Sequence, residues 1–163
     1  MAPDESGGGT APQEAAGVQA QIRVIGQYIK DLSFENPNVH RLLAAPSEKP
    51  ALRIEVNVNA TKLADKAFES LIEFKAEATS KSSVIYDLEL AYAGLFQIEN
   101  LPEQALEPFL LINCPALLFP FLRRLVADLT REGGFTPLWL DPIDFAALFM
   151  QRRQRDARPQ SVN

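Results

Sequence analysis

The chain has 163 residues and a net charge of −5, with 47% hydrophobic and 23% charged residues, which suits one globular domain with its own core. Residues 1–100 carry nine basic and fourteen acidic side chains, whereas residues 101–163 carry seven of each, so we expect no nucleic-acid-binding surface in the acidic part, since phosphate contacts need clustered Lys and Arg. No uninterrupted apolar run reaches the roughly 18 residues that cross a bilayer, so we expect no direct membrane insertion.

Both ends differ in composition from the middle of the chain. Residues 1–19 are mostly Gly, Ala, Pro, Ser and acidic residues, which predicts a disordered N-terminal tail. Residues 152–163 are polar and predict a flexible C-terminal tail, so the folded domain is expected at residues 20–151. The N-terminus lacks the pattern of a signal peptide, and the single cysteine, Cys114, suits a reducing compartment, so we expect a cytoplasmic location.

Four segments alternate apolar and polar residues with the period of a β-strand. They are residues 24–35, 52–58, 68–78 and 84–92, the last followed by a resumed apolar run at 95–96. In the first segment Tyr28 falls on the apolar parity and Gln27 on the polar one, while Ile25 and Ile29 break the pattern. The Ala, Glu and Lys content of the third segment would also suit a helix.

Helical spacing begins after residue 101. Helices are expected at residues 102–111, 113–132 and 142–155. The second would use Asn113 or Cys114 as its N-cap, with Pro115 in the first turn and Gly133 at its end, and the third would use Asp141 as its N-cap. Four strands followed by two or three helices indicate an α+β domain.

One face of the predicted sheet is acidic. If the apolar parity packs on the helices, the other parity faces outward. The outward parity carries Asp31, Glu35, Glu55, Glu73, Glu77, Asp87 and Glu89, with Arg53 and Lys75 as its main basic members. Such a face can recruit a basic partner, with a pull that weakens with salt, and it can equally be a solvated surface that keeps the protein soluble.

Aromatic residues are concentrated near the predicted helices. They are Phe109, Phe119, Phe121, Phe135, Trp139, Phe145 and Phe149. Packed on one small sheet, this set can exceed what a monomer buries, and surplus apolar surface marks a subunit interface or a binding groove. For any one of these residues, an ordinary core position is the alternative.

The sequence lacks the patterns that catalysis needs. It has no phosphate-binding loop and no dinucleotide fingerprint. The only histidine, His40, lies beside a predicted turn and far from Cys114 in sequence, which gives neither a zinc pattern nor a supported nucleophile pair. We therefore expect no enzyme activity, no metal site and no cofactor.

Four stretches, in order along the chain, resemble SecB, a family of bacterial export chaperones. They are residues 28–37 (YIKDLSFENP), 94–96 (GLF), 114–121 (CPALLFPF) and parts of 134–150 from GFTP to ALFM. The resemblance spans about residues 20–151, and it depends on the order of the four stretches because no single one is specific.

The resemblance implies a four-stranded antiparallel sheet with two main C-terminal helices packed on one face, assembling as a homotetramer that is a dimer of dimers. It also implies an ATP-independent cytoplasmic chaperone. Such a protein binds unfolded precursor proteins, keeps them translocation-competent and delivers them to the export motor SecA.

The same resemblance implies two sets of site residues. Asp31, Glu35 and Glu89 match the acidic positions that hold the basic C-terminal tail of SecA, and all three lie on the outward parity derived above, which favours a functional acidic face. The residues expected to line the client groove are Phe34, Tyr86, Leu148 and Phe149.

Two features depart from the family pattern. The loop at residues 40–50 lacks a tryptophan expected near the groove, and Asp87 replaces an apolar residue expected on the surface that faces SecA. An alternative function is that of a SecB-like chaperone dedicated to one partner, such as a toxin–antitoxin system, although Asp31, Glu35 and Glu89 favour export. A third is a small enzyme that uses Cys114, and no histidine is predicted near that thiol.

Overall fold

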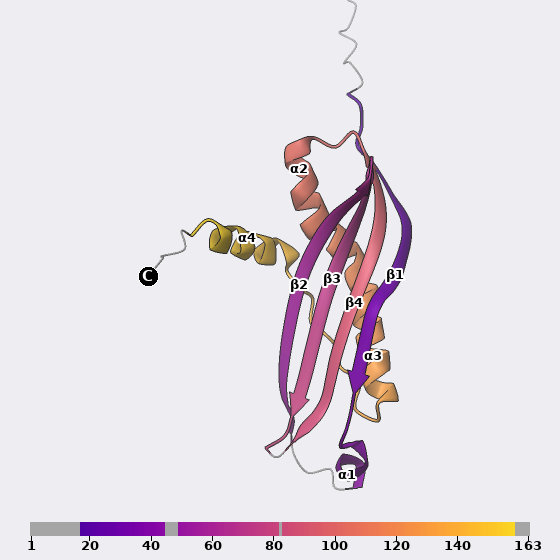
Figure 1. Ribbon diagram of the computed structural model, residues 1–163, viewed down its shortest axis with the longest axis vertical. Coiled ribbons are helices and arrows are strands. Elements are labelled where there is room, and N and C mark those ends of the chain that lie inside the picture. The colour runs from indigo at the N-terminus through magenta and orange to yellow at the C-terminus, as the bar shows by residue number, and fades with distance from the viewer. Residues whose placement is uncertain (1–16, 45–48, 82, 159–163) are drawn as a thin grey trace, which may run out of the picture.

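The fold is one twisted antiparallel sheet with helices on one side. The computed structural model describes residues 17–44, 49–81 and 83–158. Its strands are β1 (Gln21–Glu35), β2 (Ala51–Ala64), β3 (Ala67–Thr79) and β4 (Val84–Glu99). They lie in the order β1-β4-β3-β2 (Figure 1), so β1 and β2 are the two edges. The α+β class and the antiparallel sheet are confirmed, and residues 67–79 form a strand rather than a helix.

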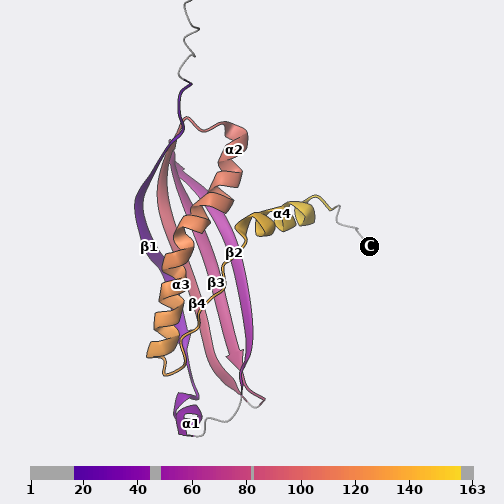
Figure 2. The ribbon, with the colours of Figure 1, turned by 180° about the vertical axis from the view of Figure 1, so that it is seen from behind.

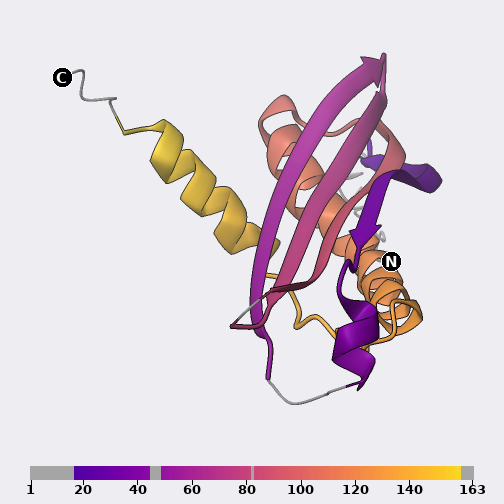
Figure 3. The same cartoon turned by 60° about the horizontal axis from the view of Figure 1, so that its bottom comes forward.

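One continuous helix, Glu103–Glu132, covers the sheet. The helical segments are α1 (Val39–Ala44), α2 (Glu103–Pro108), the π-helical η1 (Phe109–Asn113), α3 (Cys114–Glu132) and α4 (Phe145–Asp156). In Figure 2, α2 and α3 follow one another across one face of the sheet, whereas α4 leaves from beside β2 and projects outward. Figure 3 shows the same projection from another side. Phe145 and Phe149 are buried and join α4 to the rest of the fold.

The core lies between the sheet and α3. Its completely buried side chains include Ile72, Leu88, Phe96, Leu118, Leu122 and Val126. They come from one parity of β3 and β4 and from one stripe of α3, which is why the strand and helix periods were readable in the sequence. Burial of this apolar surface is the main favourable free energy of the fold.

Two β-bulges change which way the side chains of β1 point. The register with β4 shifts between Val24 and Gly26 and again between Ile29 and Asp31. Each bulge adds one residue and reverses the alternation. Tyr28 therefore pairs with Ala93 on the outer face, and the side chain of Gln27 accepts a hydrogen bond from Tyr92. The predicted parities of Tyr28 and Gln27 were wrong for this reason.

The predicted break between the first two helices is also wrong. Asn113 is helical and makes no side-chain cap, and the Cys114 N–H donates to the Phe109 carbonyl, which closes a π-turn. Pro115 has no N–H to offer the Leu110 carbonyl. The buried hydroxyl of Ser70, a residue of β3, donates a hydrogen bond to the Leu110 carbonyl at 2.8 Å instead. The helix therefore continues across Pro115, because β3 supplies the donor that the proline lacks.

The helix ends follow local capping rules. Gly134, with φ +93°, follows α3, and the N–H groups of Gly134 and Phe135 donate to the carbonyls of Arg131 and Thr130, which is a Schellman motif. The N-cap of α4 is Asp144 rather than the predicted Asp141, because the Asp144 carboxylate accepts from the Ala147 N–H at 2.9 Å.

By length and composition, the continuous helix Glu103–Glu132 is apolar enough to cross a membrane, with 39% of its most apolar window buried. The reason is its place in the core, where Leu110, Leu118 and Leu122 are buried. The helix therefore packs on the sheet, and an uninterrupted apolar run was too strict a test for it.

The predicted tails and the 40–50 loop coincide only in part with the described residues. Residues 1–16, 45–48 and 159–163 lie outside them. Residues 17–20 form no regular structure, and residues 152–156 are the last turns of α4. The first part of the 40–50 loop forms α1, which the sequence pattern did not indicate.

Candidate functional site

The face of the sheet opposite α3 is hydrophilic and mostly acidic. Glu35 of β1 lies opposite Asp87 of β4, and Asp31 lies opposite Ala91. A shallow hollow of about 250 Å³ on this face is lined by Asp31, Glu55, Asn57, Glu73, Lys75 and Glu89, among others. The predicted residues Asp31, Glu35 and Glu89 thus come to one face of two neighbouring strands.

Lys75 is one of the cations that this face holds. Lys75 Nζ lies 3.0 Å from Glu89 Oε1. The hydrogen bond to Glu89 and the charges of Asp87 and Glu89 raise the pKa of Lys75. The Asp87 Oδ1 atom is buried and has no hydrogen-bond partner among the described residues. The face therefore stabilises positive charge.

A cluster of Tyr28, Lys30 and Glu69 links β1 to β3 on the same face. Lys30 Nζ donates to Glu69 Oε1 at 2.6 Å, and the Tyr28 hydroxyl donates to Glu69 Oε2. Burial alone would raise the pKa of Glu69, but these two hydrogen bonds lower it. The bond to Glu69 also raises the pKa of Tyr28 to about 12. Lys30 is the extra residue of the second bulge of β1. The cluster therefore stabilises this bulge, after which the side chain of Asp31 lies on the outer face.

Phe34 and Tyr86 lie in an aromatic corner at one end of the sheet. Their ring centroids are 5.9 Å apart, and Tyr86 is 5.2 Å from Phe135. Phe34 also packs on Gly133, where an added Cβ would come within 2.5 Å of its ring. Asn36 Nδ2 donates to the Gly133 carbonyl at 3.0 Å. The corner therefore joins the ends of β1 and α3.

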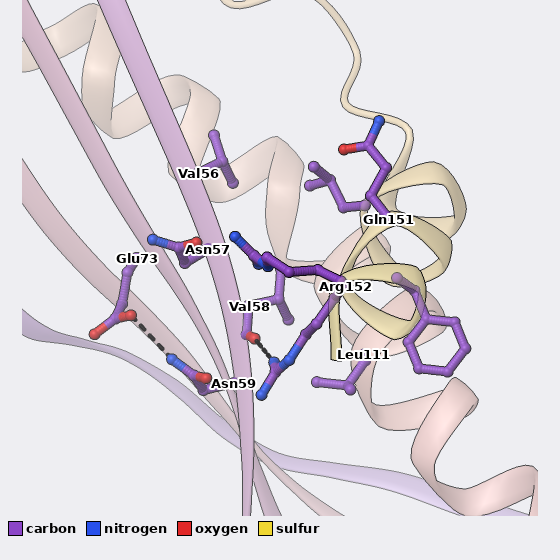
Figure 4. Close-up of a pocket in the computed structure, with 11 residues that line it drawn as sticks. Val56, Asn57, Val58, Asn59, Glu73, Leu111, Gln151 and Arg152 are labelled. Carbon is purple, nitrogen blue, oxygen red and sulfur yellow. Dashed lines mark hydrogen bonds between the residues drawn. The ribbon is translucent and has the colours of Figure 1, made fainter. Parts of the chain in front are cut away.

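A groove of about 570 Å³ runs between α4 and the edge strand β2. It is lined by Val56, Asn57, Val58, Asn59, Glu73, Leu111, Leu148, Phe149, Gln151, Arg152 and Arg155. Figure 4 shows Arg152 reaching across it to the Val58 carbonyl, with Glu73 and Asn59 on the far side of β2. The groove thus combines apolar side chains, an open strand edge and charges of both signs.

The four predicted client residues occupy two places in one subunit. Leu148 and Phe149 line the α4–β2 groove, whereas Phe34 and Tyr86 do not. Sequence reasoning missed Val58, Arg152 and Arg155 as lining residues. The alternation of apolar and polar residues at 52–58 indicated that Val56 and Val58 share one face of a strand. The position of α4 beside β2 depends on tertiary packing, which the alternation does not show.

Large apolar side chains remain exposed in two further areas. On β1 they are Ile22, Val24, Ile25, Ile29 and Leu32, and around α3 they are Leu117, Phe121 and Trp139. Patches of this kind mark contact surfaces, and β1 also has an unpaired strand edge. Of the aromatic residues concentrated near the helices, Phe121 and Trp139 are exposed, whereas Phe145 and Phe149 are buried.

The groups considered for catalysis do not form a site in the part of the chain that the structure describes. Cys114 is buried in the core, and burial raises the pKa of its thiol to about 12, so it is poorly suited to act as a thiolate nucleophile. His40 is exposed on α1. No group of three or more His, Cys, Asp or Glu residues suited to a metal ion occurs among the described residues.

Comparison with solved structures supports the fold. The chain aligns with the Mycobacterium tuberculosis SecB-like chaperone, solved in complex with a peptide from an antitoxin, with a TM-score of 0.61. The two sequences are 19% identical, and the alignment covers 76% of this chain and 90% of the other. At this identity the likeness establishes the architecture alone.

Comparison with known sequences also identifies the family of the chain. The family model of the preprotein translocase subunit SecB matches residues 15–156. The protein-export protein SecB of Afipia carboxidovorans is 47% identical, over 93% of this chain and 94% of its own length. That of Parvibaculum lavamentivorans is 48% identical, over 93% and 88%. Together with the four-stranded antiparallel sheet and its covering helix, these matches show that the chain belongs to the SecB family.

Proposed function

We propose that this protein is an export chaperone that binds unfolded preproteins without ATP, keeps them translocation-competent and delivers them to SecA. The observation that carries the proposal is the match to the SecB family over residues 15–156. The α4–β2 groove supports it, because unfolded chains offer apolar side chains and unpaired backbone groups, and a groove beside an open strand edge can bind both.

The acidic outer face is the proposed docking surface for a basic segment of SecA. Asp31, Glu35 and Glu89 are the proposed contacts, and Asp87 adds a fourth carboxylate beside Glu35. An incoming cation would compete with Lys75 for Glu89. Because Asp31, Glu35 and Glu89 are exposed, the attraction should weaken as salt is added.

We expect Glu89→Lys to weaken SecA binding by about tenfold at low salt, because it places a second ammonium beside Lys75 and reverses one charge of the face. Binding of an unfolded precursor should be unchanged. Glu103→Lys, which makes the same change on α2, is the matched control. Titration calorimetry measures both interactions, and equal SecA affinity for the Glu89 variant and the control would reject this docking surface.

The proposed assembly is a homotetramer arranged as a dimer of dimers. The exposed apolar residues of β1 and the exposed side chains Leu117, Phe121 and Trp139 support contacts between subunits. An assembly with several grooves would offer one long client repeated weak contacts, which add up to avidity.

The remaining expectations fit this role. We propose that residues 20–151 carry the chaperone activity, that the protein works in the cytoplasm, and that it is not an enzyme and needs no cofactor. The dedicated-partner alternative is not favoured, because relatives of 45–48% identity are protein-export proteins, whereas the structural neighbour with an antitoxin peptide is 19% identical.

A further inference from the structure

The acidic outer face depends on an irregularity of its edge strand. Asp31 and Glu35 both follow the second bulge of β1, which lies between Ile29 and Asp31, and Figure 3 shows β1 bending along its length. If the pairing of β1 continued past Ile29 without the extra residue, the alternation would turn both carboxylates toward the helices and Phe34 outward. The bulge therefore determines that the two β1 carboxylates lie on the outer face.

The second bulge has polar partners that the first bulge lacks. The first bulge involves Val24, Ile25 and Gly26, which have no polar side chain. At the second bulge, the extra residue Lys30 donates from Nζ to Glu69 Oε1 at 2.6 Å, and the hydroxyl of Tyr28 donates to Glu69 Oε2. Because β4 lies between β1 and β3, one carboxylate of β3 holds this bulge across a whole strand.

Glu69 is placed to hold β1 rather than to meet a partner from solution. It is 6% exposed, whereas Glu73, on the same face of β3, is exposed. A buried carboxylate is costly unless it is paired and hydrogen-bonded, and both oxygens of Glu69 have donors from β1. Ala93, the β4 residue paired with Tyr28, is completely buried, and its small side chain leaves room for the bond that crosses β4.

We propose that Glu69 is a positioning residue of the SecA-docking face: with Tyr28 and Lys30 it fixes the second bulge of β1 and so holds Asp31 on the outer face. This inference rests on the proposed docking of SecA, and it adds a residue that acts on SecA binding through its neighbours. Asp31 directly follows Lys30, so its position depends most closely on these bonds.

Lys30 separates this positioning role from the effect of charge. Lys30 is a cation beside an acidic face, so by charge alone Lys30→Met should strengthen the binding of a basic partner. If Lys30 acts by fixing the bulge, the same substitution should weaken binding, because the bulge loses one of its two side-chain bonds and Asp31 is no longer held in place. The two accounts therefore predict opposite signs for one variant.

Titration calorimetry of the full chain with SecA at low salt is the test. We expect Tyr28→Phe, which changes no charge, to weaken SecA binding by about threefold. Lys30→Met should weaken it by roughly three- to tenfold, since it removes a charge-assisted hydrogen bond. Lys30→Arg, which keeps a cationic donor, should restore most of the affinity.

Two matched controls remove the same groups elsewhere. Tyr92→Phe removes a hydroxyl that donates to Gln27 of β1 at 3.2 Å, away from the second bulge. Lys66→Met removes a lysine whose Nζ lies 3.7 Å from Glu99 Oε2. Both controls should bind SecA at least as tightly as the native protein.

Hydrogen exchange of the same variants reports on the bulge itself. Backbone amides of residues 28–33 should exchange faster in Tyr28→Phe and Lys30→Met, while those of α3 exchange as in the native protein. A variant that is only less stable overall would exchange faster in α3 as well, and that result would overturn the inference.

Native SecA affinity in Tyr28→Phe and Lys30→Met would also overturn the inference, as would tighter binding by Lys30→Met. In both cases the native protein binds SecA, so only the positioning role is rejected. A native protein that does not bind SecA would reject the proposed docking as well. An unfolded precursor, measured in the same samples, should bind all variants equally.

Discussion

Leu118→Ala is expected to lower the free energy of unfolding by about 3–4 kcal/mol, because it removes a fully buried side chain and leaves a cavity. Leu118 has no exposed surface and packs between α3 and the sheet at Gly94. Urea denaturation at a fixed protein concentration measures the effect, and the concentration is held constant because the proposed assembly would stabilise the folded state.

The adjacent residue provides the matched control. Leu117 is 50% exposed, so Leu117→Ala should cost about 1 kcal/mol or less within the subunit. Its effect should appear in the oligomeric state instead, because Leu117 belongs to the proposed contact surface. If the two variants lost equal stability, α3 would not face the sheet as described.

Gly94→Ala is expected to destabilise the protein by about 2 kcal/mol or more, since it overpacks a rigid part of the core. An added Cβ would lie 2.7 Å from Phe96 Cε2 and 2.8 Å from Leu118 Cδ2. Both neighbours are completely buried and have no free space into which to move. Thermal or urea unfolding measures the loss.

Gly26→Ala is the control for this substitution. Gly26 lies in β1, and an added Cβ there meets nothing within 4 Å. The change should leave stability within about 0.5 kcal/mol, or raise it slightly, because Ala restricts the unfolded chain. A Gly94 variant as stable as the Gly26 variant would show that α3 does not approach the sheet this closely.

The two central strands and the main helix were predictable because each buries one face. The alternation at 84–92 and the stripe through Leu118 and Leu122 report contact with the core, whereas the alternation at 52–58 marks an edge strand whose Leu52 and Ile54 stay exposed. The acidic outer face followed from the same alternation. These features depend on local periods, which a sequence displays directly.

The features that the sequence did not reveal depend on distant partners. The second bulge of β1 involves Lys30, whose partner Glu69 is 39 positions away. The π-turn before Pro115 depends on Ser70, 40 positions from the carbonyl that it satisfies. Neither partner can be identified from spacing alone, because the sheet must form before these side chains meet.

The groove illustrates the same limit for function. Leu148 and Phe149 were predicted by resemblance, but Arg152 was assigned to a flexible tail by its polar surroundings. Its contact with Val58 spans 94 positions, and it becomes visible only when α4 is placed beside β2. A polar terminal segment can therefore line a groove when it continues a helix.

Native mass spectrometry with an unfolded precursor and no nucleotide tests the central claim most directly. We expect a tetramer that takes up one unfolded precursor chain and ignores the same protein once folded. A monomer, or a tetramer that is indifferent to unfolded chains, would contradict the account and would mean that family membership here reports the fold without the chaperone activity.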